Sequence, residues 1–174
     1  QVVDTNALRD VFRHNLGNGN TRRASLDENG QEFAYASTDG ALSADGQFAW
    51  LISFRDNSRA QLWRKNMNNE AMLQVTNTAG FVSSVDVDDA GSSACFVASE
   101  RSTDLSAGDG NARDDVYRAS IGAGATVTIA REGQAATTIP ARVLADDLRL
   151  IGIDDAGRTA VVIARSPQFD ADTY

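Results

Sequence analysis

Two loops of this chain carry the same oxygen-bearing side chains at the same spacing. Each loop has Asp, Asn and Asp at offsets zero, two and six, and each precedes a similar short segment of strand character. The residues are Asp4, Asn6, Asp10, Asp109, Asn111 and Asp115. Oxygen ligands at alternating positions converge readily on a hard cation, so the spacing predicts Ca²⁺ sites, although it is not that of an EF-hand. Asx turns that brace each loop are the commoner use of these residues.

Nucleophilic catalysis has little basis in the sequence. His14 is the only histidine, it follows Arg13 at the end of a predicted strand, and no Gly-x-Ser-x-Gly elbow occurs. Cys95 is the only cysteine and lies within an apolar run, which is typical of a small buried side chain. Walker loops, dinucleotide fingerprints and zinc-ligand spacings are also absent from the sequence. We therefore predict no catalytic residue and no organic cofactor.

Further carboxylates gather just ahead of two Ala-Gly pairs. They are Asp86, Asp88, Asp89, Asp154 and Asp155. Short aspartate side chains accept hydrogen bonds from nearby backbone N–H groups in turns, which favours an architectural role. Paired carboxylates are also the groups that cleave glycosides, so a catalytic use is the alternative.

A strand pattern that occurs three times must position these side chains. Residues 10–13, 61–64 and 115–118 read Asp-Val-Phe-Arg, Gln-Leu-Trp-Arg and Asp-Val-Tyr-Arg, and lie 51 and 54 residues apart. Each is followed by a turn rich in Asn or Gly and by a second short strand, at 21–25, 72–76 and 126–130. Asn and Gly supply the positive φ of tight turns, so each copy predicts a β-hairpin. Since neighbouring strand residues face opposite ways, we expect the aromatic to pack between sheets and the arginine to reach solvent or a neighbouring sheet.

A second kind of hairpin alternates with the first. An Asp-Gly or Ala-Gly turn leads into an apolar run at 48–53, 94–99 and 160–164. A continuous apolar run of strand length is typical of a strand covered on both faces. We name the two strands of this hairpin A and B, and those of the first hairpin C and D. The chain then runs CD, AB, CD, AB, CD, AB.

Four-stranded antiparallel units of about 50 residues predict an all-β fold, a β-propeller, with strand A lining the central channel. We expect one partial or small propeller over 1–174, with strands C and D in 1–30, a blade each in 31–80 and 81–133, and strands A and B in 134–174. Three blades bend too tightly for an ordinary ring. We therefore favour a partial ring, or one completed by a second chain or copy, over closure by its own ends. A short helical turn is expected over 141–150.

The repeat resembles a known family. Ser-Ala-Asp-Gly at 43–46, followed by an aromatic residue and an apolar run, is similar to the strand-turn-strand core of the TolB-like (PD40, WD40-like) repeat. Asp-Val-aromatic-Arg at 10 and 115 supports the match, whereas the copy at 61 has Gln in place of Asp. The resemblance covers nearly the whole chain and implies a TolB-like propeller.

Composition limits the partners. The formal net charge is −8, with 19 Asp, five Glu, 15 Arg and a single Lys. An acidic surface repels phosphate backbones, so we expect no nucleic-acid partner, and no apolar run is long enough to span a membrane. We expect a secreted or periplasmic, non-enzymatic scaffold that presents loops to a protein or carbohydrate partner, with Ca²⁺ stiffening some loops. The alternative is part of a propeller enzyme, a polysaccharide lyase or hydrolase, with its active site at the channel of the complete ring.

Overall fold

The computed structural model describes residues 4–55, 59–105, 113–131, 147–153 and 160–165. Nearly all regular structure in these segments is β-strand, and the exception is one turn of 3-10 helix, η1 (Ala123–Ala125). None of the described segments forms a helix with the length and hydrophobicity that a membrane crossing requires.

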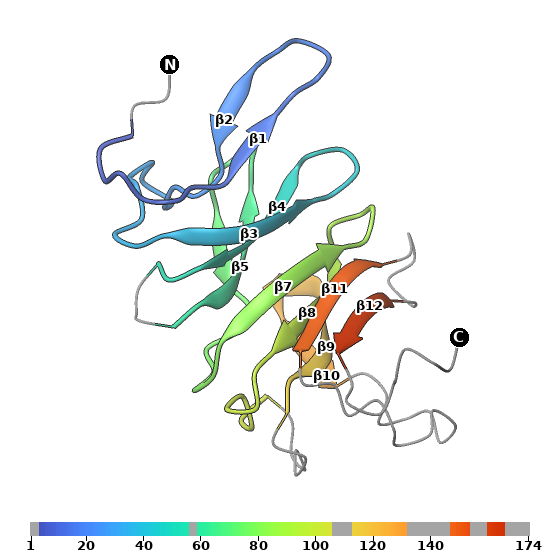
Figure 1. Ribbon diagram of the computed structural model, residues 1–174. Helices are drawn as coiled ribbons and strands as arrows, with labels where there is room; N and C mark the ends of the chain where they lie inside the picture. The colour runs from blue at the N-terminus through green and yellow to red at the C-terminus, as the bar shows by residue number, and fades with distance from the viewer. Residues whose placement is uncertain (1–3, 56–58, 106–112, 132–146, 154–159, 166–174) are drawn as a thin grey trace, which may run out of the picture.

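The strands form four antiparallel sheets, which we number in chain order (Figure 1). Sheet 1 contains β1 (Phe12–His14) and β2 (Thr21–Arg23). Sheet 2 contains β3 (Ser37–Leu42), β4 (Phe48–Ser53), β5 (Gln61–Asn66) and β6 (Met72–Gln74). Sheet 3 contains β7 (Val82–Val87), β8 (Ser93–Ala98), β9 (Asp115–Ile121) and β10 (Val127–Arg131). Sheet 4 contains β11 (Asp147–Ile153) and β12 (Ala160–Arg165).

The sheets stand side by side as the blades of a propeller do. Sheets 2 and 3 each pair their strands in sequence order, so both are complete A–B–C–D units. The A strands β3, β7 and β11 lie next to one another along one side of the row, where a propeller has its channel (Figure 1). Sheet 1 supplies only strands C and D, and sheet 4 only strands A and B. The structure therefore confirms the all-β fold prediction of a partial propeller.

Apolar side chains fill the spaces between sheets. The B strands β4 and β8 are buried on both faces from their second residue onward, as their apolar runs predict. Between sheets 2 and 3 the core includes Trp50, Leu62, Phe96 and Tyr117, and the Phe96 and Tyr117 rings stack with centroids 5.6 Å apart. A smaller cluster, including Trp63, lies between sheets 1 and 2. Burial between blades thus accounts for the continuous apolar runs.

Several element bounds differ from the sequence prediction. Strands β2 and β6 are only three residues long, because the chain leaves the ladder earlier than 25 and 76. Strand β9 runs to Ile121, past the end of the repeated segment at 115–118. The helical turn predicted over 141–150 is wrong at 147–150, which belong to β11, and the rest of that range lies outside the described residues. Pairing with β12 outweighs the weak helical spacing of two leucines.

Candidate functional site

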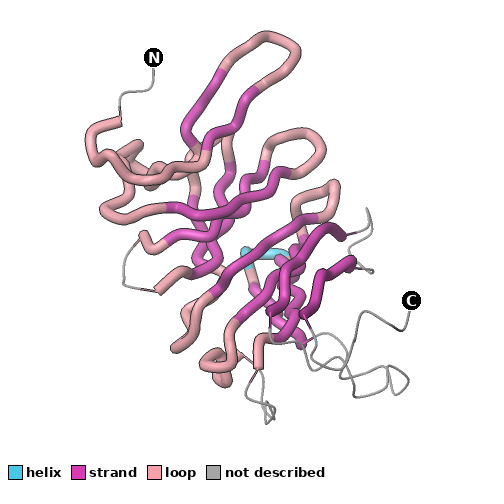
Figure 2. The backbone as a smooth tube through the Cα atoms, in the orientation of Figure 1, coloured by secondary structure: helices cyan, strands magenta, loops and turns pink. Residues whose placement is uncertain are grey.

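The connections between strands gather at two ends of the molecule. Among the described residues, the A–B and C–D turns lie at one end, and the longer B–C and D–A connections lie at the other (Figure 2). We call these the turn end and the loop end. The loop end is made by the described parts of residues 4–11, 24–36, 54–60, 75–81 and 99–114.

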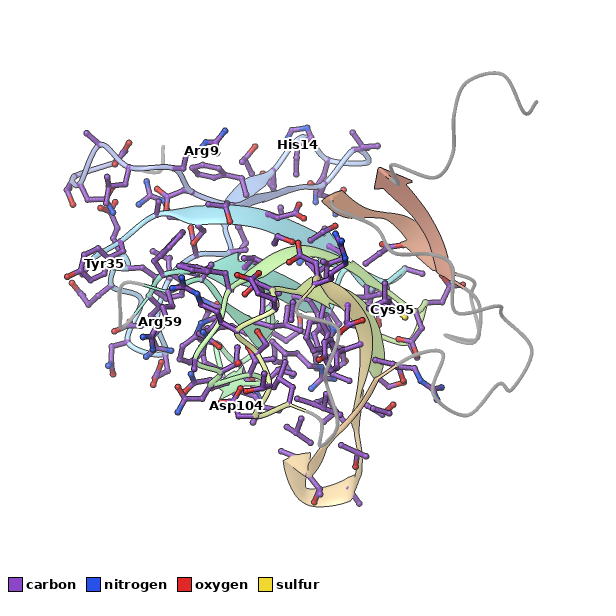
Figure 3. The ribbon with its side chains drawn as sticks, turned by 60° about the horizontal axis from the view of Figure 1, so that its bottom comes forward. Arg9, His14, Tyr35, Arg59, Cys95 and Asp104 are labelled. Carbon is purple, nitrogen blue, oxygen red and sulfur yellow. The ribbon has the colours of Figure 1, made fainter. Side chains whose placement is uncertain are left out.

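Large side chains are exposed on the loop end. Leu8, Tyr35 and Phe81 come from three different connections, and each is exposed. Exposed Arg9 and Arg59 lie at the same end, as Figure 3 shows for Arg9, Tyr35 and Arg59 relative to His14. Aromatic residues and arginine are enriched where proteins bind one another, so this composition is typical of a protein-binding surface.

Hydrogen bonds tie the first two loops of this end together. The Glu32 carboxylate accepts the Thr5 N–H at 3.1 Å and the Thr5 hydroxyl at 2.6 Å, and it also pairs with Arg23. The Asn6 side-chain amide donates to the Phe33 carbonyl at 3.0 Å. These partners, the Thr5 hydroxyl first, hold the pKa of Glu32 below its usual value. The loop carrying Tyr35 is thereby fixed to the N-terminal loop.

A second network supports Phe81. The buried Gln61 amide donates to the Thr78 carbonyl at 3.1 Å and accepts the Thr78 N–H at 2.9 Å. Asp104 accepts both the Thr78 hydroxyl and the Ala79 N–H. Gly80 has no room for a side chain, because a Cβ there would lie 2.2 Å from the Ser102 Oγ. The backbone that carries Phe81 is therefore held by hydrogen bonds to Gln61 and to Asp104.

The predicted metal residues that the structure describes are engaged in other interactions. The Asp4 carboxylate accepts the N–H groups of Asn6 and Ala7 at 3.2 and 2.9 Å, and Asn6 caps Leu8 in the same way. These are the Asx turns that the sequence offers as the alternative. Asp109 and Asn111 lie outside the described residues, and Asp115 begins β9 of sheet 3, whereas Asp10 lies just before β1 of sheet 1. Within the described segments no three His, Cys, Asp or Glu side chains form a group that could hold a metal.

The hydrogen bond of Asp10 shows the role of the first position of the repeated segment. The Asp10 carboxylate accepts a hydrogen bond from the Ser25 hydroxyl at 2.6 Å, and the Ser25 oxygen accepts one from the Val11 N–H at 3.1 Å. At the equivalent position of sheet 2, Gln61 accepts the Thr76 hydroxyl at 2.9 Å, and Thr76 accepts the Leu62 N–H. An uncharged amide thus makes the same bond as the aspartate. The shared task of this position is to accept a hydroxyl at the end of strand D.

The catalytic candidates also have structural roles. His14 Nδ1 lies 2.7 Å from the Thr21 hydroxyl across the hairpin, at the turn end. Asp88 accepts the Ser92 and Ser93 N–H groups at 2.8 and 3.1 Å, which is turn chemistry, and Cys95 is buried in β8. Asp154 and Asp155 lie outside the described residues. The described part of the chain therefore brings together no nucleophile, base and acid.

The repeated arginine of strand C reaches the following sheet. Arg64 Nε donates to the Gly91 carbonyl in the β7–β8 turn at 2.8 Å, and its guanidinium lies 3.6 Å from the Phe48 ring centroid. Arg13 lies against Gly46, the matching glycine of the β3–β4 turn, where a Cβ would come within 3.1 Å of its Nε. The arginine of strand C therefore links its own blade to the A–B turn of the following blade. The alternation of side chains along the strand predicts that it reaches a neighbouring sheet.

The repeated aromatic of strand C faces the preceding sheet. Trp63 packs toward sheet 1 and is 5% exposed, and Tyr117 packs toward sheet 2 and is fully buried. Phe12 holds the same position in sheet 1 but is 47% exposed. The prediction that these aromatics pack between blades is thus correct for the second and third copies and wrong for Phe12, because no sheet among the described residues lies beyond it.

The loop-end side chains are absent from the sequence predictions. Tyr35 and Phe81 stand one or two residues before an A strand, in polar connections that the repeat pattern does not cover. The available signal is the occurrence of a large apolar residue in a segment otherwise rich in Asn, Thr, Ser and Gly. That signal indicates function only after the fold brings the connections to one end.

Comparison with known proteins identifies the fold. No family model and no curated protein matches this chain. Among solved structures, a putative TolB from Agrobacterium tumefaciens is 17% identical over 69% of this chain and 40% of its own, with a TM-score of 0.47. TolB from Acinetobacter baumannii is 12% identical over 90% of this chain and 34% of its own, with a TM-score of 0.55. The chain thus spans well under half the length of either protein. Its fold is that of a TolB-like β-propeller.

Proposed function

We propose that this chain is a non-enzymatic propeller module that binds a protein partner through its loop end. The observation that carries the proposal is that the connections at the loop end expose Leu8, Tyr35, Phe81, Arg9 and Arg59. Tyrosine and arginine are enriched at the centres of protein interfaces, and an aromatic side chain buries a large area while few of its bonds lose rotational freedom.

The rigidity of the loops supports this assignment. Glu32 holds the loop before β3 to the N-terminal loop, and Gln61 and Asp104 hold the connection before β7. Loops that are ordered before binding lose less entropy on binding, so the partner gains affinity from the same contacts. The turn end is built mainly from Asn, Asp and Gly turns in the described segments, and its exposed large apolar residues there are Leu16 in a C–D turn and Leu42 at the end of β3.

Other features belong to the same proposal. A carbohydrate partner, Ca²⁺ in the loops at 4–10 and 109–115, and a secreted or periplasmic location rest on the sequence alone. A second chain that completes the ring is also proposed, since an open propeller leaves strand edges unpaired. Fractionation of cells that express the complete gene tests the location.

The test compares the two ends of the molecule. Immobilised wild-type protein, a Tyr35→Ser, Phe81→Ser double variant and a Leu16→Ser variant are exposed to an extract of the source cells, and retained proteins are identified. All three positions are exposed, so each variant should fold. We expect one partner to be retained by the wild type and the Leu16 variant and lost by the double variant. A partner retained equally by all three overturns the assignment of binding to the loop end, and binding of a glycan array in place of any protein replaces the protein partner by the carbohydrate one.

A further inference from the structure

The turn end carries a pocket lined by polar residues. Its volume is about 130 Å³, roughly that of four water molecules in the liquid. The lining comes from the β1–β2 hairpin and consists of Arg13, Asn15, Asn18, Asn20 and Arg22. Figure 3 shows His14 of the same hairpin well apart from Tyr35 and Arg59 of the loop end. The pocket is therefore distinct from the surface proposed for the protein partner.

The two arginines of the pocket reach toward sheet 2. The Arg13 guanidinium lies against Gly46 in the β3–β4 turn, where a Cβ would come within 3.1 Å of its Nε. Arg22 donates to the Met67 carbonyl at 2.8 Å and pairs with Glu70, both in the β5–β6 turn. The pocket thus lies where sheets 1 and 2 meet.

The pairing of these arginines departs from the repeat. Arg13 and Arg22 stand directly opposite each other in the β1–β2 ladder. In sheets 2 and 3 the arginine of strand C stands opposite an apolar residue, Leu73 and Ala130 respectively. Like charges directly opposite each other destabilise a sheet, so the second arginine has a cost. A local rule broken in this way is typical of a functional site.

Both guanidinium groups retain hydrogen-bond donors. In sheet 2 the equivalent Arg64 donates to the Gly91 carbonyl at 2.8 Å. Among the described residues, no acceptor bonds the Arg13 guanidinium. Arg22 has two acceptors in the β5–β6 turn, fewer than the N–H groups of a guanidinium. The arginines can therefore donate further hydrogen bonds into the pocket.

The asparagines of the turn add donors as well. Asn15 Oδ1 accepts the N–H groups of Gly17 and Asn18 at 2.9 and 3.2 Å, and Asn18 Oδ1 accepts the Asn20 N–H at 3.0 Å. Each of these side-chain oxygens is thus used within the turn, whereas neither NH₂ group has an acceptor in the described part of the chain. The pocket therefore offers donors, and the ligand that fits it is rich in acceptors.

The charge around the pocket is positive. Lys65 and Arg22 share one carboxylate, that of Glu70, and Asp45 is the carboxylate that interacts with Arg13. Three cations thus face two carboxylates, in a chain whose formal net charge is −8. An anion in the pocket would balance the excess charge and relieve the repulsion between the paired arginines.

We propose that this pocket binds one tetrahedral oxyanion, a phosphate or sulfate group. Its donors come from two strands and from the turn between them, so they approach a ligand from several sides. Phosphate and sulfate have oxygens in all of these directions, whereas the two oxygens of a carboxylate match the fork of one guanidinium. The volume admits one such group and excludes a sugar ring. Because the acidic chain repels polyanions, the group is a free ion or a monoester of a neutral molecule.

The first test is an NMR titration with inorganic phosphate and with sulfate, at an ionic strength held constant with chloride. We expect saturating shifts of backbone amides in residues 13–22 and in the two turns that face them. The Asn18→Asp variant keeps the oxygen that caps Asn20 but replaces a donor by a negative oxygen, so it should bind at least about tenfold more weakly. Asn18 is exposed, and the spectrum without anion checks that the hairpin is intact. Shifts that do not saturate overturn the proposal, as does wild-type affinity in this variant.

A second variant tests the arginine pair. Arg13→Gln removes a guanidinium that no described residue accepts, so it should keep the wild-type spectrum and lose at least about tenfold in affinity. Arg9→Gln lowers the net charge by the same amount at the exposed loop end, and it should bind the anion as the wild type does. Equal losses in both variants would assign the binding to overall charge and overturn the site.

The source of the group is identified by comparing ligands in the same titration. Inorganic phosphate, glucose 6-phosphate, glucose and acetate are the probes. Tighter binding of glucose 6-phosphate than of inorganic phosphate supports a monoester, and the reverse order supports a free ion. Glucose that binds as tightly as its phosphate would overturn the proposal, because the anion would then contribute nothing. Acetate that binds as tightly as inorganic phosphate would overturn the preference for a tetrahedral group.

Discussion

Two of the seams between neighbouring sheets, sheet 1 with sheet 2 and sheet 2 with sheet 3, use the same strand positions but are held together by different forces. Between sheets 2 and 3 the contact is an extended apolar cluster around Trp50, Phe96 and Tyr117. Between sheets 1 and 2 the apolar cluster around Trp63 is smaller and is surrounded by charged side chains. The difference follows from strand content: sheets 2 and 3 face each other with four strands each, whereas sheet 1 brings only two.

Charged groups of the first seam reach across it in several places. Lys65, the only lysine and fully buried, donates from β5 to the Leu26 carbonyl at 2.7 Å and pairs with Glu70 at 2.7 Å. Arg22 of β2 bonds both the Met67 carbonyl and Glu70. Hydrogen bonds and ion pairs bury less apolar surface than the cluster between sheets 2 and 3, and apolar burial is what stabilises that seam. Sheet 1 should therefore separate from sheet 2 more easily than sheet 2 separates from sheet 3.

The largest expected effect is at the apolar seam. Tyr117→Ala removes a fully buried ring that stacks on Phe96, so it should lower the free energy of unfolding by about 3 to 5 kcal/mol. Urea denaturation measures this loss. Phe81→Ala, an exposed aromatic at the loop end, is the control and should change the free energy by less than about 1 kcal/mol. Equal effects would show that the second seam is not the stable part of the fold.

A smaller and more local effect is expected at the charged seam. Lys65→Met keeps most of the side-chain volume but leaves the Leu26 carbonyl without its donor, so a loss of about 2 kcal/mol is expected. Hydrogen exchange should show faster opening of β1 and β2, with β7 to β9 unchanged. Arg101→Met, which alters an exposed ion pair, is the control and should leave exchange unaltered. Uniformly faster exchange in all sheets would contradict the separation of the two seams.

Acid should loosen the same region before the rest. The pKa of Glu32 is held below its ordinary value of 4.5, first by the Thr5 hydroxyl and further by the Thr5 N–H and Arg23. Its contribution to stability is therefore complete above that ordinary value and is lost as the pH falls through the lower folded pKa. Hydrogen exchange as a function of pH, corrected for intrinsic rates, should show residues 5–33 opening first. The Glu32→Gln variant should lack this step, and a step that persists in it would assign the transition to another group.

The sequence predicts the blades better than the seams. Strand types, their order and the face of each strand follow from the repeats at 10–13, 61–64 and 115–118, because side-chain alternation is a local property. The charged ties of Lys65 and Arg22 were not predicted, since each joins residues about 40 apart or more whose proximity depends on how the sheets dock. Phe12 shows the same limit. Its repeat position predicts burial, but its exposure depends on whether another sheet covers it.

The smallest expected effect concerns the loop before sheet 1, where turn chemistry and calcium give different results. Asp4 accepts the Asn6 and Ala7 N–H groups through one carboxylate oxygen, which an asparagine amide oxygen can replace. Asp4→Asn should therefore unfold like the wild type, whereas Asp4→Ala should lose about 0.5 to 1 kcal/mol. Thermal unfolding with added Ca²⁺ and with EDTA measures both variants. If Ca²⁺ stabilises the wild type and Asp4→Asn abolishes that gain, the loop binds the ion, because a neutral amide cannot replace a charged ligand of a divalent cation without loss of affinity.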